Sequence, residues 1–270
     1  MRSPLKFAAF ADIAPGNSLT ARCEAIAGAG CRGLETLVYP TTSLEAWQQE
    51  VKQATTQAGI EPVAVILGGG LDLYRPDKLG WVREALPAIA EVGAAAMLTP
   101  EYRAQDPLPL FPPYPLPPRA ELVQVERAIG EISELAGRLA LPVYFEPVTQ
   151  FESRFWREVE PVRAICQTLN TSWVKLCLDF HNMNITEASL IATLGRAGPW
   201  IGHIHLADNN RRLPGQGHLD FTTGLAILGE LGYTGWYSFE CGVEGDFQTQ
   251  VQSCITYLNG LISRDQGRSS

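Results

Sequence analysis

The chain has 270 residues, of which 46% are apolar and 19% charged, with a net charge of −8 and a pI near 5.1. This length suits one α/β barrel better than two ordinary domains. The acidic balance disfavours a nucleic acid or an anionic membrane surface as a partner, because binding to phosphates needs clustered Lys and Arg.

Eight short apolar segments recur along the chain at roughly even intervals, as expected of strands that are buried on both faces. They span residues 5–11, 33–38, 62–67, 94–99, 142–147, 174–179, 201–206 and 236–241. Between several of them lie stretches with helical period, namely residues 44–58, 81–92, 120–139 and 248–261. Strands that alternate with helices are typical of parallel βα units, and eight such units close into a barrel.

The predicted fold is therefore a single-domain (β/α)8 TIM barrel over residues 1–264, followed by a flexible tail at residues 265–270. A doubly wound open sheet is the main alternative, but no G-x-G-x-x-G motif follows the first strand. The N-terminal apolar run is short and is broken by Asp12, and no run of about 18 apolar residues predicts a membrane span. Six cysteines without a C-x-x-C pair indicate reduced thiols, so we expect a cytoplasmic protein.

Residues 100–118 interrupt this rhythm with eight prolines. Proline cannot continue a helix or a central strand, so we expect an irregular connection here. The segment follows the fourth strand, at the end of the barrel where active sites of this fold lie. We interpret it as a semi-rigid lid or wall over the site, with a subunit contact or simple surface packing as the alternatives.

Polar residues occur where four consecutive strands end, in place of the Val, Ile and Leu that are usual there. These residues are Glu146, Asp179, His205 and Glu240. Side chains alternate between the two faces of a strand. If apolar neighbours such as Phe145 point outward to the helices, the four polar residues point into the mouth of the barrel. Burial of an unpaired charge is costly, so their presence calls for a specific partner.

Three carboxylates at one opening would repel one another strongly unless a cation lay among them. An oxygen-rich set with one imidazole and no thiolate suits Mn²⁺, Mg²⁺ or Co²⁺ better than a structural zinc. We therefore predict one divalent metal ion bound by Glu146, Asp179, His205 and Glu240. For any one of these residues alone, a buried ion pair is the alternative.

Two further polar residues lie within the strands themselves. Glu35 faces inward near the end of the second strand, where we expect a contact with a substrate or support of a ligand, or else a structural ion pair. His203 lies one pleat deeper than His205. We expect it to line the barrel floor or to support a ligand from behind.

Two loops carry additional candidates for substrate contacts. Glu152 lies in the loop after the fifth strand, where a surface carboxylate is the alternative. Arg211 lies in the loop after the seventh strand, with Arg212 as the competing candidate. An arginine at the mouth could hold a hydroxyl, a carboxylate or a phosphate.

Four segments together resemble the sugar-phosphate isomerase/epimerase family with a xylose isomerase-like TIM barrel. They read FEPVTQFES, LDFHNMNITE, HIHLADNNRRLPGQGHLDF and YSFE, and they lie mainly between residues 142 and 241. The third segment is the most specific, through its order H-L-A-D, R and P-G-x-G-H. The resemblance is nearest to ketose 3-epimerases of the tagatose and psicose type and to hydroxypyruvate isomerases.

The resemblance implies a Mn²⁺-type ion at the four predicted ligands, with Glu146 and Glu240 serving also as the proton-transfer pair. It implies substrate contacts from Glu152, Arg211 and a histidine shortly after the aspartate ligand. The family commonly has D-x-x-H at that point, whereas residues 179–182 of this chain read DFHN. The expected contact therefore comes from His181, with Asn182 as the alternative.

These features predict an enzyme that moves a proton next to a ketose carbonyl through an enediolate, most closely a ketose 3-epimerase. Hydroxypyruvate isomerase and a lyase of the inosose dehydratase type are the alternatives, since their chemistry begins with the same proton removal. A nuclease of the apurinic-site repair type shares the barrel but uses three metals and more histidines than the four of this chain. A small sugar is the expected partner, and homo-oligomers are usual in families of this kind.

Overall fold

All eight apolar segments form strands in the computed structural model, which describes residues 4–68, 71–103 and 105–266. The strands are β1 (Lys6–Phe10), β2 (Gly33–Val38), β3 (Glu61–Leu67), β4 (Ala95–Leu98), β5 (Val143–Phe145), β6 (Val174–Asp179), β7 (Ile201–Leu206) and β8 (Trp236–Phe239). Each strand pairs in parallel with the next along the chain, and β8 pairs with β1, which closes the barrel. The predicted (β/α)8 fold is confirmed.

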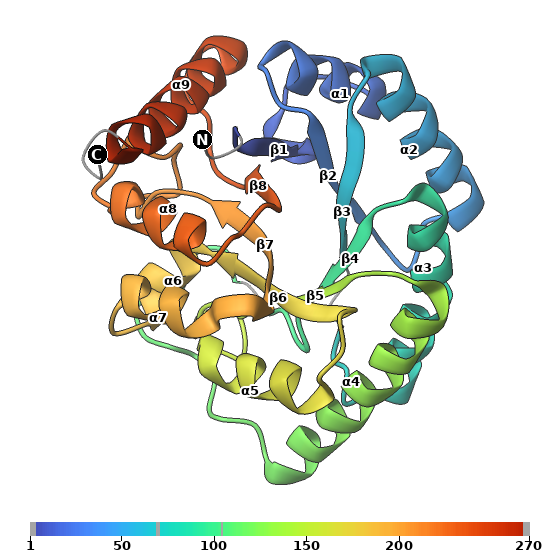
Figure 1. Ribbon diagram of the computed structural model, residues 1–270. Coiled ribbons are helices and arrows are strands. Elements are labelled where there is room, and N and C mark those ends of the chain that lie inside the picture. The colour runs from blue at the N-terminus through green and yellow to red at the C-terminus, as the bar shows by residue number, and fades with distance from the viewer. Residues whose placement is uncertain (1–3, 69–70, 104, 267–270) are drawn as a thin grey trace.

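Helices connect the strands and surround them on the outside (Figure 1). They are α1 (Leu19–Gly28), α2 (Leu44–Ala58), α3 (Pro76–Val92), α4 (Arg119–Leu139), α5 (Val159–Leu169), α6 (Phe180–Thr186), α7 (Leu190–Ala197), α8 (Phe221–Glu230) and α9 (Phe247–Gln266), with short 3₁₀ helices η1 (Ala11–Ile13) and η2 (Gly198–Trp200). The helix predicted at residues 81–92 begins earlier, with Pro76 in its first turn, a position that proline favours.

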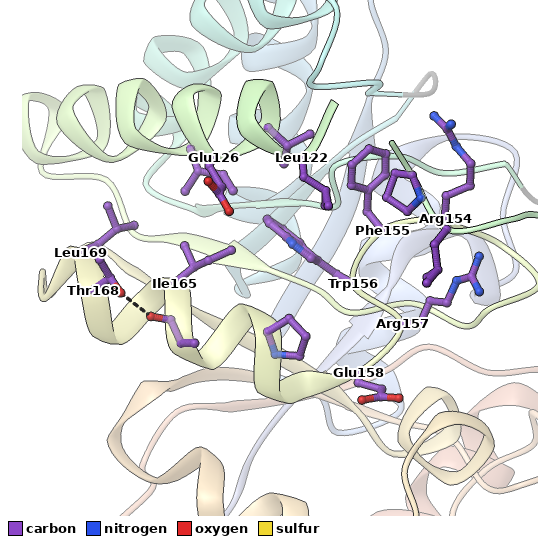
Figure 2. A pocket seen from close by; sticks show the side chains of 16 residues that line it. Leu122, Glu126, Arg154, Phe155, Trp156, Arg157, Glu158, Ile165, Thr168 and Leu169 are labelled. Carbon is purple, nitrogen blue, oxygen red and sulfur yellow. Dashed lines mark hydrogen bonds between the residues drawn. The ribbon is translucent and has the colours of Figure 1, made fainter. Parts of the chain in front are cut away.

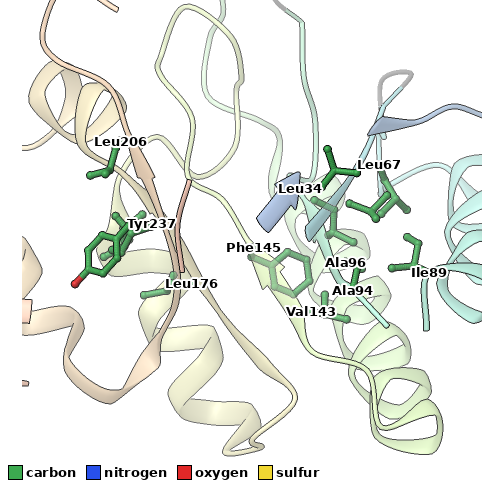
Figure 3. Close-up of a cluster of buried hydrophobic side chains, with 14 of the residues drawn as sticks. Leu34, Leu67, Ile89, Ala94, Ala96, Val143, Phe145, Leu176, Leu206 and Tyr237 are labelled. Atoms are coloured by element: carbon green, nitrogen blue, oxygen red, sulfur yellow. The ribbon is translucent and has the colours of Figure 1, made fainter. Parts of the chain in front are cut away.

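Alternation of side chains along the strands separates two apolar regions. Outward-facing residues meet the helices in the main core, which includes Leu34, Leu67, Val143, Phe145 and Leu206 (Figure 3). Inside the barrel, a smaller cluster packs against Tyr144 and Trp236 and consists of Ala8, Val63, Ala64, Met97 and Cys177. This apolar filling leaves the carboxyl-terminal mouth as the place where buried polar side chains gather.

The proline-rich segment forms neither helix nor strand in its described part, as predicted. It runs past the N-terminal end of α5 before α4 begins (Figure 1). Arg157 Nη2 donates to the carbonyl oxygen of Tyr114 at 2.8 Å, and the Tyr114 hydroxyl donates to the carbonyl oxygen of Arg103 at 2.5 Å. These hydrogen bonds hold the segment against the barrel.

The end of the chain differs from the prediction. The last helix, α9, continues through Gln266, so the first two residues of the tail expected at 265–270 are helical. The remaining four lie outside the described residues. Within the described ranges, no helix combines the length and the apolar character needed to cross a lipid bilayer.

Candidate metal centre and active site

The four predicted metal ligands converge at the mouth of the barrel. Asp179 is the last residue of β6 and His205 lies in β7, while Glu146 and Glu240 directly follow β5 and β8. One ligand atom from each residue lies within 4.8 Å of the others. His205 Nδ1 is 3.1 Å from Glu146 Oε1 and 3.3 Å from Glu240 Oε2. The structure thus gathers the four side chains that strand-end position had singled out.

Backbone hydrogen bonds explain why the two glutamates share one direction. The Glu146 N–H donates to the carbonyl oxygen of Leu98 at 3.1 Å, and the Glu240 N–H donates to that of Leu206 at 3.4 Å. Both glutamates thereby continue the sheet by one residue. Because side chains alternate along an extended chain, Glu146 points inward when Phe145 packs outward in the main core.

Burial changes the ionisation of these acids in different directions. It raises the pKa of Glu146 to about 7, against the opposing effect of His205. For Glu240, burial is outweighed by His205 and Arg211, so its pKa lies below the ordinary value. Burial raises the pKa of Asp179, whose Oδ2 atom has no hydrogen-bond partner among the described residues. The cluster therefore holds more carboxylate than its own cations compensate.

The donor set fits a divalent cation of the Mn²⁺, Mg²⁺ or Co²⁺ class. Three carboxylates and one imidazole match the preference of these ions for oxygen. The buried Asp179 Oδ2 accepts no hydrogen bond from the described residues, and its ion pair with Arg211 Nη1 spans 3.8 Å, so it remains available to a bound ion. Cys177 also lies close to Glu146 and His205. Burial raises the pKa of its thiol well above the ordinary value, which disfavours the thiolate that a soft metal requires.

A cavity of about 310 Å³ adjoins this centre. One side is polar and is lined by Glu146, Glu152, Asn182, Arg211 and Glu240. The other side is formed by the ends of β1, β2 and β3 and the segments that follow them, and includes Phe10, Leu37, Tyr39, Ile66 and Leu71. Tyr102, which follows β4, also lines the cavity. The cavity has the size of a small-ligand site, and its two halves would meet different parts of a bound molecule.

Arg211 reaches this cavity from the loop between β7 and α8. Its guanidinium nitrogens lie 3.5 Å from Glu240 Oε2 and 3.7 Å from Glu152 Oε1. The backbone of Arg211 has a φ of 58°, a left-handed conformation that non-glycine residues adopt rarely and often at functional sites. The competing Arg212 pairs instead with Glu244 at 2.6 Å on the surface. The geometry therefore favours Arg211 as the cation of the site.

Asp208 organises the loop that carries Arg211. It is fully buried, and its carboxylate accepts the backbone N–H groups of Gly215, Gly217 and Leu219 at 2.9, 2.9 and 3.1 Å. The Arg211 N–H donates to the Asp208 carbonyl oxygen at 2.9 Å. Asp208 is not among the residues predicted from the sequence. The available signal was an aspartate two residues after a buried strand and ahead of two glycines, a combination typical of ordered turns.

Glu152 is held in the wall of the cavity by two hydroxyl-bearing residues. Its Oε2 atom accepts the backbone N–H of Thr149 at 3.1 Å and the Thr149 hydroxyl at 2.8 Å. The Tyr102 hydroxyl donates to its Oε1 atom at 3.4 Å. Tyr102 belongs to the proline-rich segment, so the first part of that segment contributes to the wall of the site. A wall or lid was predicted for this segment, but Tyr102 is not among the residues predicted to contribute to it.

His181 and Asn182 take different positions. His181 Nδ1 lies 3.0 Å from the carbonyl oxygen of Asp208, and the side chain does not line the cavity as described. Asn182 is buried and lines the cavity, with its Nδ2 atom 3.5 Å from Glu146 Oε1. Its Oδ1 atom has no partner within the described part of the chain. Of the two residues predicted for this substrate contact, Asn182 lines the cavity and His181 does not.

Glu35 lies against His205 and is not among the residues that line the described cavity. It is fully buried, and its Oε2 atom is 3.0 Å from His203 Nε2 and 3.0 Å from His205 Nε2. His203 stacks on Tyr144 with ring centroids 5.9 Å apart. Of the roles expected for Glu35, the geometry thus favours support of a ligand over contact with a substrate.

A larger hollow of about 790 Å³ lies outside the barrel, between α4 and α5 (Figure 2). Its walls are largely apolar and include Leu122, Phe155, Trp156, Ile165 and Leu169. Every group of potential metal ligands found among the described residues includes His205, so none lies in this hollow. The potential metal ligands of the described residues therefore gather around His205 at the mouth of the barrel.

Comparisons with known proteins find one matching family and several relatives of this chain. The family described as xylose isomerase-like TIM barrel matches residues 23–257. The 3-dehydro-D-guloside 4-epimerase of Escherichia coli (strain K12) is 27% identical over 212 residues, which cover 75% of this chain and 80% of that protein. The ketose 3-epimerase of Arthrobacter globiformis is 26% identical over 200 residues, which cover 71% and 67%.

A solved structure supports the fold. The 3-keto-D-glucoside 4-epimerase from E. coli, in its apo form, superimposes with a TM-score of 0.82. The match covers 95% of this chain and 99% of that chain, at 22% sequence identity. At that identity the likeness bears on the fold alone.

Proposed function

We propose, from the premise that this chain belongs to the xylose isomerase-like TIM barrel family, that it is a divalent-metal-dependent sugar epimerase. The single observation that carries the proposal is the position of Glu146 and Glu240. They follow different strands, each has an oxygen atom within 3.3 Å of His205 Nδ1, and both line one cavity. Such a pair can exchange a proton with two faces of one carbon atom.

The ligand set of Glu146, Asp179, His205 and Glu240 would hold the ion. When bound, a divalent ion supplies Lewis acidity at the oxygen atoms of a substrate. This requirement for a metal is part of the proposal. The buried Asp179 Oδ2, which accepts no hydrogen bond from the described residues, and the gathering of three carboxylates support it.

The proton is moved by the two glutamates. One carboxylate removes a proton from the carbon next to a ketone, which leaves an enediolate. The other, in its carboxylic acid form, returns a proton to the opposite face, and the configuration of that carbon is inverted. Environments that drive two carboxyl pKa values apart are typical of such acid and base pairs. In the metal-free protein, burial raises the pKa of Glu146 to about 7, while His205 and Arg211 outweigh burial at Glu240 and lower its pKa.

The remaining polar residues of the cavity would orient the sugar. Arg211 and Glu152 lie 3.7 Å apart and offer a donor and an acceptor for hydroxyl groups. Asn182 adds an amide oxygen that has no partner among the described residues. Hydrogen bonds from the sugar hydroxyls to these three side chains would hold the reacting carbon near the two glutamates.

The first candidate reaction is the 3-epimerisation of a free ketose, the reaction named for the Arthrobacter relative. The second is the 4-epimerisation of a keto-glycoside, as the name of the E. coli relative describes. The apolar half of the cavity, with Phe10, Leu37 and Ile66, favours this second candidate, because an aglycone could occupy it without loss of hydrogen bonds. Both reactions move a proton next to a ketone.

Deuterium exchange tests the proposal and separates the candidates. The protein is incubated in D₂O with Mn²⁺ and either D-psicose, D-tagatose or an alkyl 3-keto-glucoside, and NMR spectra are recorded after the ion is removed. Deuterium at C3 of a ketose identifies the first candidate, and deuterium at C4 of the keto-glucoside identifies the second. Transfer to the neighbouring carbon would indicate an isomerase instead, and loss of water a lyase. If no substrate of the panel exchanges a proton, the proposal is wrong.

A further inference from the structure

Glu35 makes an unusual contact for a residue in the middle of a TIM-barrel strand. It belongs to β2, and it reaches across the interior of the barrel to β7. Its Oε2 atom accepts two hydrogen bonds, from His203 Nε2 and from His205 Nε2, each at 3.0 Å. All three side chains are at least 99% buried, so water does not compete for these contacts.

The two ring nitrogens of His205 therefore face different partners. Nε2 meets Glu35, whereas Nδ1 lies 3.1 Å from Glu146 Oε1 and 3.3 Å from Glu240 Oε2. A neutral imidazole carries a proton on one nitrogen and a lone pair on the other. Because carboxylate oxygens lie near both nitrogens, the metal-free ring can carry a proton on each. A metal ion at the strand ends would require the lone pair of Nδ1, and the remaining proton would then stay on Nε2, where Glu35 accepts it.

We propose that Glu35 is a positioning residue that holds His205 in its Nε2–H tautomer, with Nδ1 directed at the metal site. The inference rests on the proposed function, since it assigns the residue that prepares one of the four ligands. A carboxylate behind a ligating histidine orients the ring and raises the basicity of the ligating nitrogen. Glu35 does so without contact with the cavity in which the substrate would lie.

The surroundings of Glu35 favour this role over that of an ordinary ion pair. Within the described residues, neither Lys nor Arg is paired with it, and its Oε1 atom has no hydrogen-bond partner. His203 is held by its stacking on Tyr144, so its N–H fixes the carboxylate that His205 then contacts. The burial of a carboxylate whose only partners are two imidazoles is explained if one of them must keep a defined tautomer.

Glu101 provides a matched comparison. It is also fully buried, but it accepts hydrogen bonds from the guanidinium groups of Arg103 and Arg154. Glutamine at either position removes one buried negative charge with almost no change in side-chain volume. Only Glu35 touches a predicted metal ligand, so only its substitution should alter metal binding.

The experiment compares Mn²⁺ binding to wild type, Glu35→Gln and Glu101→Gln, each freed of metal, by titration followed with electron paramagnetic resonance. The expected result is one ion per chain in the wild type and an affinity about 10- to 100-fold weaker in Glu35→Gln. Glu101→Gln should bind as the wild type does. Equal affinities in wild type and Glu35→Gln, or an equal loss in both variants, would overturn the inference. Two ions per chain would also overturn it, because Glu35, His203 and His205 would then form a second metal site.

A spectroscopic measurement on the wild type covers the case in which Glu35→Gln does not fold. The ¹⁵N shifts of the His205 ring are recorded in protein saturated with Mg²⁺. A protonated Nε2 and an unprotonated Nδ1 support the inference, and the opposite tautomer overturns it.

Failure of the proposed function can be told apart from failure of this inference. The proposed function alone fails if the wild type binds Mn²⁺ but exchanges no substrate proton. If the wild type binds neither ion, the metal requirement and this inference fail together.

Discussion

Glu101 and Glu146 are both buried glutamates that follow strands of the barrel, yet their neighbours differ in charge. Glu101 contacts two guanidinium groups, with Arg103 Nε at 2.7 Å and Arg154 Nη2 at 2.8 Å. Glu146 has His205 as its nearest charged partner, and Glu240 and Asp179 raise its pKa further by repulsion. We refer to the first group as the Glu101 cluster (Glu101, Arg103, Arg154) and to the second as the strand-end cluster (Glu146, Asp179, His205, Glu240).

The comparison shows that the positive charge available around a buried carboxylate indicates whether its role is structural or functional. In the Glu101 cluster the counter-charge comes from the chain, and the contacts join the loops after β4 and β5. In the strand-end cluster the counter-charge is incomplete, and the missing part must come from a ligand. Four predictions test this distinction.

The largest effect is expected for Glu240→Gln, which removes one member of the proton-transfer pair. Turnover should fall roughly 10²- to 10⁴-fold, the usual contribution of a positioned base, while substrate binding stays measurable. The matched control is Glu244→Gln, since Glu244 is an exposed glutamate that pairs with Arg212. Turnover of Glu240→Gln at the wild-type rate would refute the catalytic assignment and leave the strand-end cluster as a structural feature only.

Removal of a cation should damage the Glu101 cluster. In Arg154→Met, Glu101 stays buried with only Arg103 as partner, and breaking a buried pair in this way typically costs about 3–5 kcal/mol of unfolding free energy. The control is Arg138→Met, because Arg138 is an exposed residue 3.9 Å from Glu134 and its loss should change stability by about 0.5 kcal/mol or less. Denaturant unfolding measures both. A loss below about 1 kcal/mol in Arg154→Met would mean that the cluster is not structural.

Addition of a metal ion should stabilise only the strand-end cluster. Mn²⁺ at about 100 times its Kd should raise the unfolding free energy by about 2.7 kcal/mol, and a chelator should reverse this. The gain should shrink in Asp179→Asn, which removes a ligand, and persist in Glu101→Gln. Thermal unfolding with and without Mn²⁺ checks both expectations. A wild type whose unfolding temperature ignores Mn²⁺ would contradict the metal assignment.

The sequence was sufficient to predict the barrel and the four converging ligands because both depend on simple periodicity. Strands buried on both faces are continuous in apolar residues, so Glu146, Asp179 and Glu240 stand out at their ends. Parallel strands that close into a barrel bring all such ends to one opening, whatever the details of the loops. Convergence of the four residues follows from topology alone.

The other residues of the site depend on conformations that periodicity does not determine. Arg211 reaches the cavity because its backbone is left-handed, whereas Arg212 points to the surface. Tyr102 reaches Glu152 from an irregular segment. The direction of Glu35 towards a histidine, and away from the substrate cavity, depends on contacts across the barrel between strands far apart in sequence. Such contacts become visible only in three dimensions.

The smallest effect concerns the pH dependence of the Glu101 cluster. Burial alone would raise the pKa of Glu101, but the hydrogen bonds from Arg154 and the charge of Arg103 outweigh it and hold the pKa below the ordinary value. A carboxyl group with a lowered pKa stabilises the fold fully above its unfolded pKa, near 4.3, and loses that contribution as the pH falls through the folded value. The wild type should therefore be more stable than Glu101→Gln near neutral pH, and the difference should shrink below about pH 4.3.

Because one proton is involved, the difference in unfolding free energy between wild type and Glu101→Gln changes by no more than about 1.4 kcal/mol per pH unit. Denaturant unfolding of the metal-free proteins between pH 7 and pH 3 measures this difference, and the shared titration of the strand-end cluster largely cancels in it. A protonated glutamate resembles glutamine, which is why the two proteins should converge in acid. A difference that grows as the pH falls would show that Glu101 is protonated in the folded state near neutral pH, and the contrast between the two clusters would then be lost.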